Sequence, residues 1–258
     1  KIKEMIVVMP DCFTRYGGSQ YVNSTATGRY EDYMIREIVP FIDSNFKTIP
    51  KPASRCIIGK SSGGYGAMWL AMRHPDIFGL MVTHSGDSAF EYCYMKYFPE
   101  FSVQISRYGR GHIGISNFIK TQLNFEQPKS NDFHNIINVI GMSSCYSPNP
   151  KRKEYNFDLP FDIYTSEIIP HIWKKWLQFD PVRLVSKYKA NLKKLKLIFV
   201  DCGTRDEFNL QAGARIYCDK LRQNGIKFIH QEFNDGHMNI QYRYDTSFGF
   251  ISEYFSYA

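Results

Sequence analysis

The chain has 258 residues, a formal net charge of +7 and 43% hydrophobic residues. This composition is ordinary for a globular protein, and it excludes a disordered, collagen-like or coiled-coil chain. No apolar run approaches the roughly 18 residues that a membrane-spanning helix needs, so we expect no membrane span. The apolar run that follows the first four residues lacks a small-residue cleavage site, which argues against a signal peptide.

The positive charge and the cysteines do not indicate a special binding function. The densest basic stretch, residues 183–196, alternates with apolar residues as on a solvated helical face, so we predict no nucleic-acid partner. The six cysteines contain no C-x-x-C pair, which argues against a metal site. Cysteines inside apolar runs behave as small buried hydrophobes, and we therefore favour a reducing, cytoplasmic location.

Strand-like apolar runs alternate with helical patterns, which is typical of a mostly parallel α/β sheet with helices on both faces. The first predicted strand is Met5–Met9, and apolar spacing predicts a helix over Tyr30–Ile42 that bends at Pro40. The remaining predicted elements are, in chain order, strand Cys56–Ile58, helix Ala67–Met72, strand Leu80–Thr83, strand Leu197–Val200, helix Leu210–Leu221, strand Phe228–Phe233 and helix Ile240–Tyr254.

The alternation is interrupted over residues 86–194. This stretch is rich in aromatic residues and carries helical patterns at Ile113–Phe125, Phe133–Met142 and Ile168–Phe179. We interpret it as a largely helical, cap-like insertion folded over one end of the sheet. The chain is therefore predicted to form a single α/β domain over residues 1–258, with the insertion inside it.

The most informative motif lies at residues 55–67, which read R-C-I-I-G-K-S-S-G-G-Y-G-A. Gly59 to Gly63 fit G-x-S-x-G, with a predicted strand before the motif and a helix after it. In that setting the serine sits on a sharp strand-to-helix turn, and side chains two positions away on either side would collide with neighbouring elements. The sequence thus predicts that Ser61 is a nucleophile. The backbone N–H of Ser62, at the helix start, would face developing negative charge.

A phosphate-binding loop is the main competing interpretation of this motif. Gly59-Lys60-Ser61 also matches the end of G-x-x-x-x-G-K-[ST]. That loop requires glycine at position 54, where this chain has Ser54, and several loop residues between the strand and the Gly-Lys pair. Because the apolar strand runs directly into the motif, the sequence argues against a nucleotide site.

A nucleophilic serine needs a base and an acid that orients the base. On a sheet of this kind the chain order is serine, acid, histidine, and functional groups follow the carboxyl ends of strands. Asp206 lies in the loop after the strand Leu197–Val200, and we predict it as the acid. Asp201 and Glu207, on either side of it, remain alternatives.

The predicted base is His237, which follows the strand Phe228–Phe233 in the segment Asn-Asp-Gly-His. Among the other histidines, His84 ends a strand near the nucleophile, but it precedes the acid in the chain and so comes too early for the base. The remaining histidines lie within a strand, in the insertion or after the elbow helix, where structural roles are expected.

With these residues assigned, the chain resembles the α/β-hydrolase fold, and more narrowly the putative-esterase (esterase D-like) family. The elbow G-K-S-S-G-G-Y-G-A is close to that family's usual G-H-S-M-G-G-Y-G-A, and the resemblance extends over Met5–Ser85 and from about residue 180 to the end. It implies that Ser61 is the nucleophile, Asp206 the acid and His237 the base. This chain differs from the family pattern on both sides of the nucleophile, where Lys60 and Ser62 replace histidine and methionine.

These residues predict a serine carboxylic-ester hydrolase that works through an acyl-enzyme, with no metal or organic cofactor. The expected substrate is a small-molecule or carbohydrate-linked ester. Two alternatives remain open: an acyltransferase that passes the acyl group to a carbohydrate or another alcohol, and a non-catalytic binding protein on the same scaffold. The oligomeric state is not predicted.

Aromatic residues crowd the start of the insertion, and Tyr94 and Tyr97 are candidates for lining an acyl or aryl pocket. Packing of the insertion onto the sheet would explain them equally well.

In the hydrolase fold the second oxyanion N–H comes from a loop after an earlier strand. No such loop precedes Met5–Met9, so we expect the sequence to lack its natural N-terminal strands; alternatively, the segment Asp11–Gln20 supplies the donor from Gly17 or Gly18.

Overall fold

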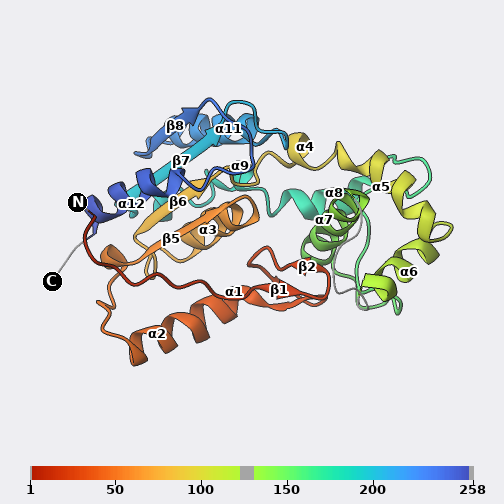
Figure 1. Cartoon of the computed structure of the whole chain (residues 1–258), viewed down its shortest axis with the longest axis horizontal. Helices are drawn as coiled ribbons and strands as arrows, with labels where there is room; N and C mark the ends of the chain where they lie inside the picture. The colour runs from red at the N-terminus through yellow and green to blue at the C-terminus, as the bar shows by residue number, and fades with distance from the viewer. Residues whose placement is uncertain (1, 123–130, 256–258) are drawn as a thin grey trace. The chain divides into compact units, whose positions relative to one another are not determined.

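A sheet of four parallel strands forms the centre of the part of the chain that holds the predicted catalytic residues, as the computed structural model in Figure 1 shows. The structure describes residues 2–122 and 131–255. Its strands lie in the order β5-β6-β7-β8. They are β5 (Cys56–Lys60), β6 (Leu80–His84), β7 (Leu197–Gly203) and β8 (Ile229–Phe233). The last four predicted strands are thereby confirmed.

Two compact units make up the chain. Unit 1 contains Lys1–Pro10, Glu31–Cys93 and Asp180–Ala258, and unit 2 contains Asp11–Tyr30 and Tyr94–Phe179. The sheet belongs to unit 1. Unit 2 includes most of the stretch predicted as an insertion, residues 86–194, together with the earlier segment Asp11–Tyr30.

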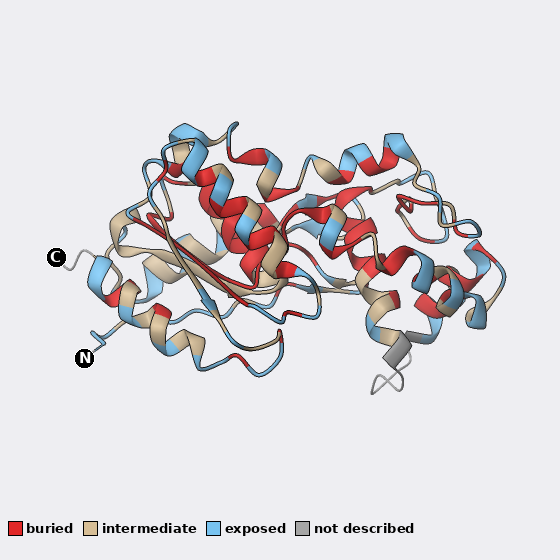
Figure 2. Ribbon diagram, turned by 90° about the horizontal axis from the view of Figure 1, so that it is seen from above, coloured by how far each residue is buried: buried red, intermediate tan, exposed pale blue. Residues whose placement is uncertain are grey.

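Helices cover both faces of the sheet in unit 1. Helix α3 (Ser62–Arg73) packs on β5 and β6, and α11 (Leu210–Gln223) packs on β7. Helix α12 (Arg243–Tyr254) packs on the opposite face, where a buried apolar cluster joins it to the strands. The cluster consists of Leu80, Val82, Leu197, Phe199 and Ile251. Burial of each such side chain contributes roughly 1.5–3 kcal/mol. The two central strands, β6 and β7, are buried along their whole length, and Figure 2 shows buried residues in strands and helices of the interior.

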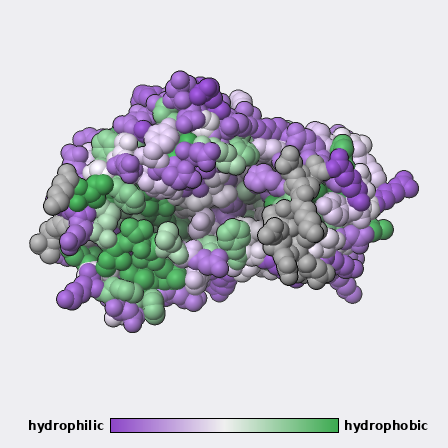
Figure 3. Space-filling model, viewed as in Figure 1, coloured by the Kyte–Doolittle hydropathy of each residue, from purple (hydrophilic) through white to green (hydrophobic). Residues whose placement is uncertain are grey.

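The predicted strand Met5–Met9 is wrong, because this segment forms no regular secondary structure. Met5 packs beside the apolar cluster, but Val7 is 56% exposed and Met9 88% exposed. An apolar run becomes a strand only where another strand pairs with it, and no strand among the described residues pairs with this segment. Figure 3 shows the resulting apolar surface over this part of unit 1.

The helix predicted over Tyr30–Ile42 forms in three consecutive pieces. These are α1 (Tyr30–Asp32), η1 (Tyr33–Ile38) and α2 (Val39–Asn45). The middle piece is a wider π-helical segment that ends just before Pro40. Proline has no N–H to donate and crowds the preceding turn, so the irregularity lies next to the position where the sequence predicted a bend.

Unit 2 is largely helical and has an aromatic core. Its longer helices are α5 (Tyr97–Ile105), α6 (His112–Gln122), α7 (Asn131–Tyr146) and α8 (Pro170–Leu177). The last three correspond to the helices predicted in the insertion, although residues 123–125 lie outside the described residues. Unit 2 also contains two short antiparallel hairpins, which precede these helices in the chain. One pairs β1 (Phe13–Thr14) with β2 (Gly17–Gly18), and the other pairs β3 (Asn23–Ser24) with β4 (Gly28–Arg29).

Short helices lie in unit 1 just before the chain leaves it at Cys93 and after the chain returns at Asp180. They are α4 (Phe90–Cys93), α9 (Pro181–Leu184) and α10 (Lys189–Leu192). The buried carboxylate of Asp180 fixes two of them, since it accepts hydrogen bonds from the N–H groups of Ala89 (2.9 Å), Phe90 (3.2 Å) and Val182 (3.1 Å). Burial nevertheless raises the pKa of Asp180 to about 6, although the three N–H donors act in the opposite direction.

The raised pKa of Asp180 predicts a pH-dependent stability. Between about pH 4 and pH 6 the folded state holds a proton on Asp180 that the unfolded state has released, so stability falls as the pH rises through this window. The difference between the pKa of Asp180 in the folded protein and its ordinary value corresponds to roughly 3 kcal/mol of stability. Urea unfolding at both ends of the window should show wild type losing this much relative to Asp180→Asn. Parallel pH profiles for the two proteins would contradict the prediction.

Candidate active site

The predicted nucleophile lies on a strained turn in unit 1. Strand β5 ends at Lys60, helix α3 begins at Ser62, and Ser61 between them has φ +57° and ψ −125°. This backbone conformation is costly for a residue other than glycine and persists only where surrounding structure holds it. The Ser61 N–H donates to the His84 carbonyl at 2.9 Å, and its carbonyl accepts from the Tyr65 N–H at 2.9 Å. The turn is therefore fixed from both sides.

Glycines make this turn sterically possible. A Cβ on Gly59 would lie 2.3 Å from the backbone carbonyl of Gly63, and one on Gly64 would lie 2.7 Å from the Thr83 hydroxyl. Contacts this short cannot occur without moving the backbone. The contact at Gly59 agrees with the predicted reason for glycine two positions before the serine.

The structure brings the three predicted catalytic residues together. His237 Nε2 lies 3.1 Å from Ser61 Oγ, and His237 Nδ1 lies 2.8 Å from Asp206 Oδ2. His237 is 4% exposed and Asp206 3%. The Phe208 ring stands edge-on to the imidazole, with centroids 4.6 Å apart. A carboxylate on Nδ1 leaves Nε2 free to accept the serine proton, which is the arrangement that general-base activation requires.

The environment keeps Asp206 ionised. Burial by itself opposes the charge, but the hydrogen bond and charge of His237 outweigh it, aided by the Phe208 N–H and the Ser85 hydroxyl. Together these lower the pKa of Asp206 below its ordinary value. The Phe208 N–H donates to Oδ1 at 2.9 Å, so each carboxylate oxygen has a partner.

Neither alternative acid contacts the imidazole of His237 in the described structure. Asp201 lies within β7 and pairs with His84 and Arg243. Glu207 Oε2 instead accepts the backbone N–H of His237 at 2.7 Å, so this carboxylate holds the loop that carries the base. Apart from the position of Glu207 next to Asp206, no sequence pattern indicates this backbone contact.

The residues that flank Ser61 define the polarity around it. Ser62 is the first residue of α3, so its N–H has no preceding helical turn to bond and can face a ligand. Its hydroxyl donates to Asp87 Oδ2 at 3.5 Å. On the other side, partial burial lowers the pKa of Lys60, although the charges of Asp206 and Glu207 oppose this effect.

The two tyrosines predicted to line a pocket belong to unit 2, and both are buried. The Tyr94 ring lies edge-on to Trp176, with centroids 5.9 Å apart. The Tyr97 ring carries the Lys96 ammonium group 5.0 Å from its centroid. The ring contact of Tyr94 is the kind that the packing interpretation expects.

All six cysteines are free thiols. In the part of the chain that the structure describes, no three His, Cys, Asp or Glu side chains gather as metal ligands. No helix among the same residues is both long and apolar enough to span a bilayer.

Comparison with known proteins places these observations in a family. The model of the family described as "Putative esterase" matches residues 2–239. An esterase of Mycobacterium tuberculosis is 33% identical over 88 residues, which is 34% of this chain and 19% of that protein. An endo-1,4-beta-xylanase/feruloyl esterase of Xylanibacter ruminicola is 33% identical over 86 residues, 33% of this chain and 12% of that protein.

Solved structures show the same fold. A ferulic acid esterase aligns with a TM-score of 0.54 at 18% identity, covering 92% of this chain and 65% of that one. The S-formylglutathione hydrolase FrmB of Staphylococcus aureus aligns with a TM-score of 0.51 at 16% identity, covering 91% and 68%. This chain thus spans less than a fifth of the mycobacterial relative and about two thirds of these structures. It has the α/β-hydrolase fold and belongs to the esterase family.

Proposed function

We propose that this chain is a serine carboxylic-ester hydrolase that acts through an acyl-enzyme. The observation that carries the proposal is the 3.1 Å approach of His237 Nε2 to Ser61 Oγ on a strained elbow, with Asp206 on the other ring nitrogen. Membership of the esterase family supports it. A binding protein would not need a strained serine and an oriented base.

In the proposed reaction His237 takes the Ser61 proton as Oγ attacks the ester carbonyl. The Ser62 N–H stabilises the resulting oxyanion, and one such donor lowers a barrier by about 3 kcal/mol. The imidazolium then gives its proton to the leaving alcohol, and the C–O bond of the ester breaks. Water then enters, loses a proton to His237 and attacks the acyl-enzyme carbonyl. The bond from the acyl group to Ser61 Oγ breaks, the His237 imidazolium returns its proton to Oγ, and the free acid leaves.

The experiment that tests the function is turnover of a panel of esters by the purified protein. The panel contains p-nitrophenyl esters of increasing acyl length and methyl ferulate, because two of the similar proteins are named for feruloyl or ferulic ester cleavage. Product analysis in the presence of a competing alcohol separates the two catalytic possibilities. Free acid as the main product supports the proposed hydrolase. An ester of the competing alcohol as the main product would contradict it and indicate an acyltransferase.

The pocket assignment of Tyr94 and Tyr97 remains a prediction with its own test. If these rings contact the acyl group, Tyr94→Ala should change the ranking of acyl chain lengths, measured as kcat/KM across the panel. Tyr108→Ala, at another ring of unit 2 that contacts Phe118, serves as the control for general loosening of that unit. A uniform loss with Tyr94→Ala and no change in ranking would favour packing alone.

A further inference from the structure

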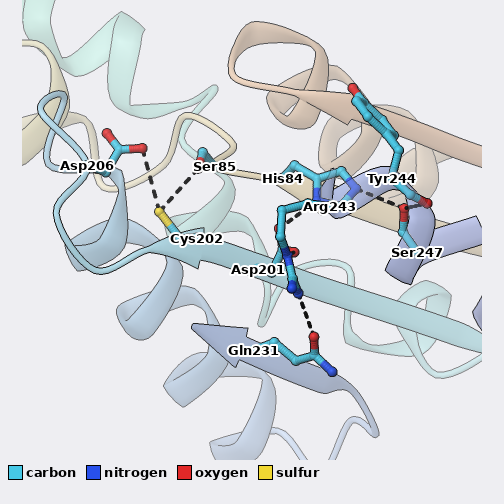
Figure 4. Close-up of polar contacts among 9 residues, drawn as sticks. All are labelled: His84, Ser85, Asp201, Cys202, Asp206, Gln231, Arg243, Tyr244 and Ser247. Carbon is cyan, nitrogen blue, oxygen red and sulfur yellow. Dashed lines mark hydrogen bonds and ion pairs between the residues drawn. The ribbon is translucent and has the colours of Figure 1, made fainter. Parts of the chain in front are cut away.

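Unit 1 contains a second serine, histidine and aspartate in contact, apart from Ser61. Ser247 Oγ lies 3.0 Å from His84 Nε2, and His84 Nδ1 lies 2.6 Å from Asp201 Oδ1 (Figure 4). Ser247 and Asp201 are 0% exposed and His84 is 1% exposed. A substrate cannot reach this serine. The array must act within the protein.

The array joins three strands to one helix through an arginine. Asp201 Oδ2 accepts from Arg243 Nε at 2.9 Å, and another nitrogen of the same guanidinium donates to Gln231 Oε1 at 2.6 Å. His84, Asp201 and Gln231 are register partners on β6, β7 and β8. They form a polar row across the sheet, and Arg243, the first residue of α12, covers it. We call His84, Asp201, Arg243 and Ser247 the buried clamp.

The buried clamp is connected to the residues around the nucleophile. The backbone carbonyl of His84 accepts the N–H of Ser61, and the backbone carbonyl of Asp201 accepts the N–H of Ser85 at 2.8 Å. The Ser85 hydroxyl donates to Cys202 Sγ at 3.4 Å, and Sγ lies 3.8 Å from Asp206 Oδ2 (Figure 4). One set of strand ends therefore supports both the elbow and the acid.

The candidate base, His237, is linked to the buried clamp through the chain segment that leads into α12. His237 lies in the loop between β8 and α12, shortly before Arg243. The position of α12 therefore limits where the imidazole can lie. Arg243 is largely buried and Asp201 completely so, and loss of the arginine would leave a buried carboxylate without its cation, which strongly favours local rearrangement.

We propose that Arg243 is a positioning residue, which holds the start of α12 on Asp201 and thereby keeps His237 in reach of Ser61. The inference rests on the proposed function of that site. Displacement of a reacting group by about 1 Å can reduce turnover on the order of 100-fold, so release of this contact should act on kcat even though Arg243 touches no substrate.

The test compares four variants by turnover and by proton NMR. Arg243→Gln removes the charge, and Arg243→Lys restores it with a different shape. The double variant Asp201→Asn/Arg243→Gln removes both charges, which carries the test if the single variant does not fold. Arg215→Gln is the matched control, because Arg215 forms an exposed pair with Glu232 of β8 at 2.6 Å. Activity is measured well below the unfolding temperature of each variant.

We expect Arg243→Gln to lower kcat about 100-fold with little change in KM, and the double variant to show the same loss. Arg243→Lys should recover part of it, and Arg215→Gln should match wild type. The low-field proton on His237 Nδ1, assigned by its absence in Asp206→Asn, should shift or broaden in Arg243→Gln. A wild-type kcat and an unchanged resonance, with only a lower unfolding temperature, would overturn the proposal.

The NMR measurement separates this inference from the proposed function. If wild type turned over no ester at all, the function would fail, while the response of the His237 proton to Arg243→Gln would still decide whether Arg243 positions the histidine. If wild type is active and the resonance does not respond, the positioning role fails alone.

Discussion

Replacement of Ser61 by alanine should reduce kcat for p-nitrophenyl acetate by several orders of magnitude, on the order of 10⁶-fold. The hydroxyl is the only group at the elbow that lies within hydrogen-bonding distance of His237 Nε2 in the described structure, so its loss removes covalent catalysis rather than weakening it. Steady-state kinetics with active-site-titrated wild type gives the comparison. Retention of more than about one per cent of the activity would contradict the assignment.

Ser62→Ala is the matched control for that variant. It removes a neighbouring hydroxyl, which contacts Asp87, but keeps the backbone N–H that faces the proposed oxyanion. We expect its kcat within about tenfold of wild type, since loss of one weak hydrogen bond is worth about 1 kcal/mol. A loss as large as that of Ser61→Ala would mean that the wrong serine has been assigned.

Asp206→Asn should lower kcat on the order of 10⁴-fold while the protein stays folded. Asparagine can donate an N–H toward Nδ1, which favours the tautomer that places the ring proton on Nε2, where Ser61 needs an acceptor. The effect should appear in kcat far more than in KM, because the imidazole orientation matters most in the transition state.

Glu207→Gln is the control for the carboxylate. Its amide oxygen can still accept the His237 N–H that Glu207 holds at 2.7 Å, so we expect kcat within about tenfold of wild type. If Glu207→Gln were as damaging as Asp206→Asn, the roles of the two neighbouring carboxylates would have to be reconsidered.

The meeting of Ser61, His237 and Asp206 could be predicted from the sequence because its signals are local. The elbow needs glycine at fixed distances from Ser61, and the close contacts of Gly59 and Gly64 explain that requirement. The candidate acid and base follow strands whose carboxyl ends lie at one edge of a parallel sheet, so chain order pointed to His237 and to the loop of Asp206, with Asp201 and Glu207 left as alternatives for the acid.

The supporting contacts could not be predicted, because they join distant parts of the chain. His84 meets Ser247, 163 positions away, and Arg243 meets Asp201, 42 positions away. Neither spacing has a periodicity that a sequence can reveal. Asp201 was also hard to place: the apolar run ends at Val200, yet β7 continues to Gly203, because the polar row lets a charged residue sit inside the strand.

The predicted strand Met5–Met9 was wrong for a different reason. Its composition is that of a strand, since an apolar run of this length is typical of buried sheet positions. Strand pairing also requires a second strand alongside the segment, and no strand among the described residues pairs with this one. Composition therefore indicated the tendency of the segment but not its structure.

The central claim is that Ser61 is the nucleophile of an acyl-enzyme. It is tested most directly by reaction of the folded protein with a fluorophosphonate probe, followed by mass spectrometry of the intact chain and its peptides. Our assignment predicts a single adduct per chain, on Ser61, which is absent from Ser61→Ala and forms much more slowly in Asp206→Asn. A folded protein that gains no adduct, or one that carries it on another serine, would contradict the claim.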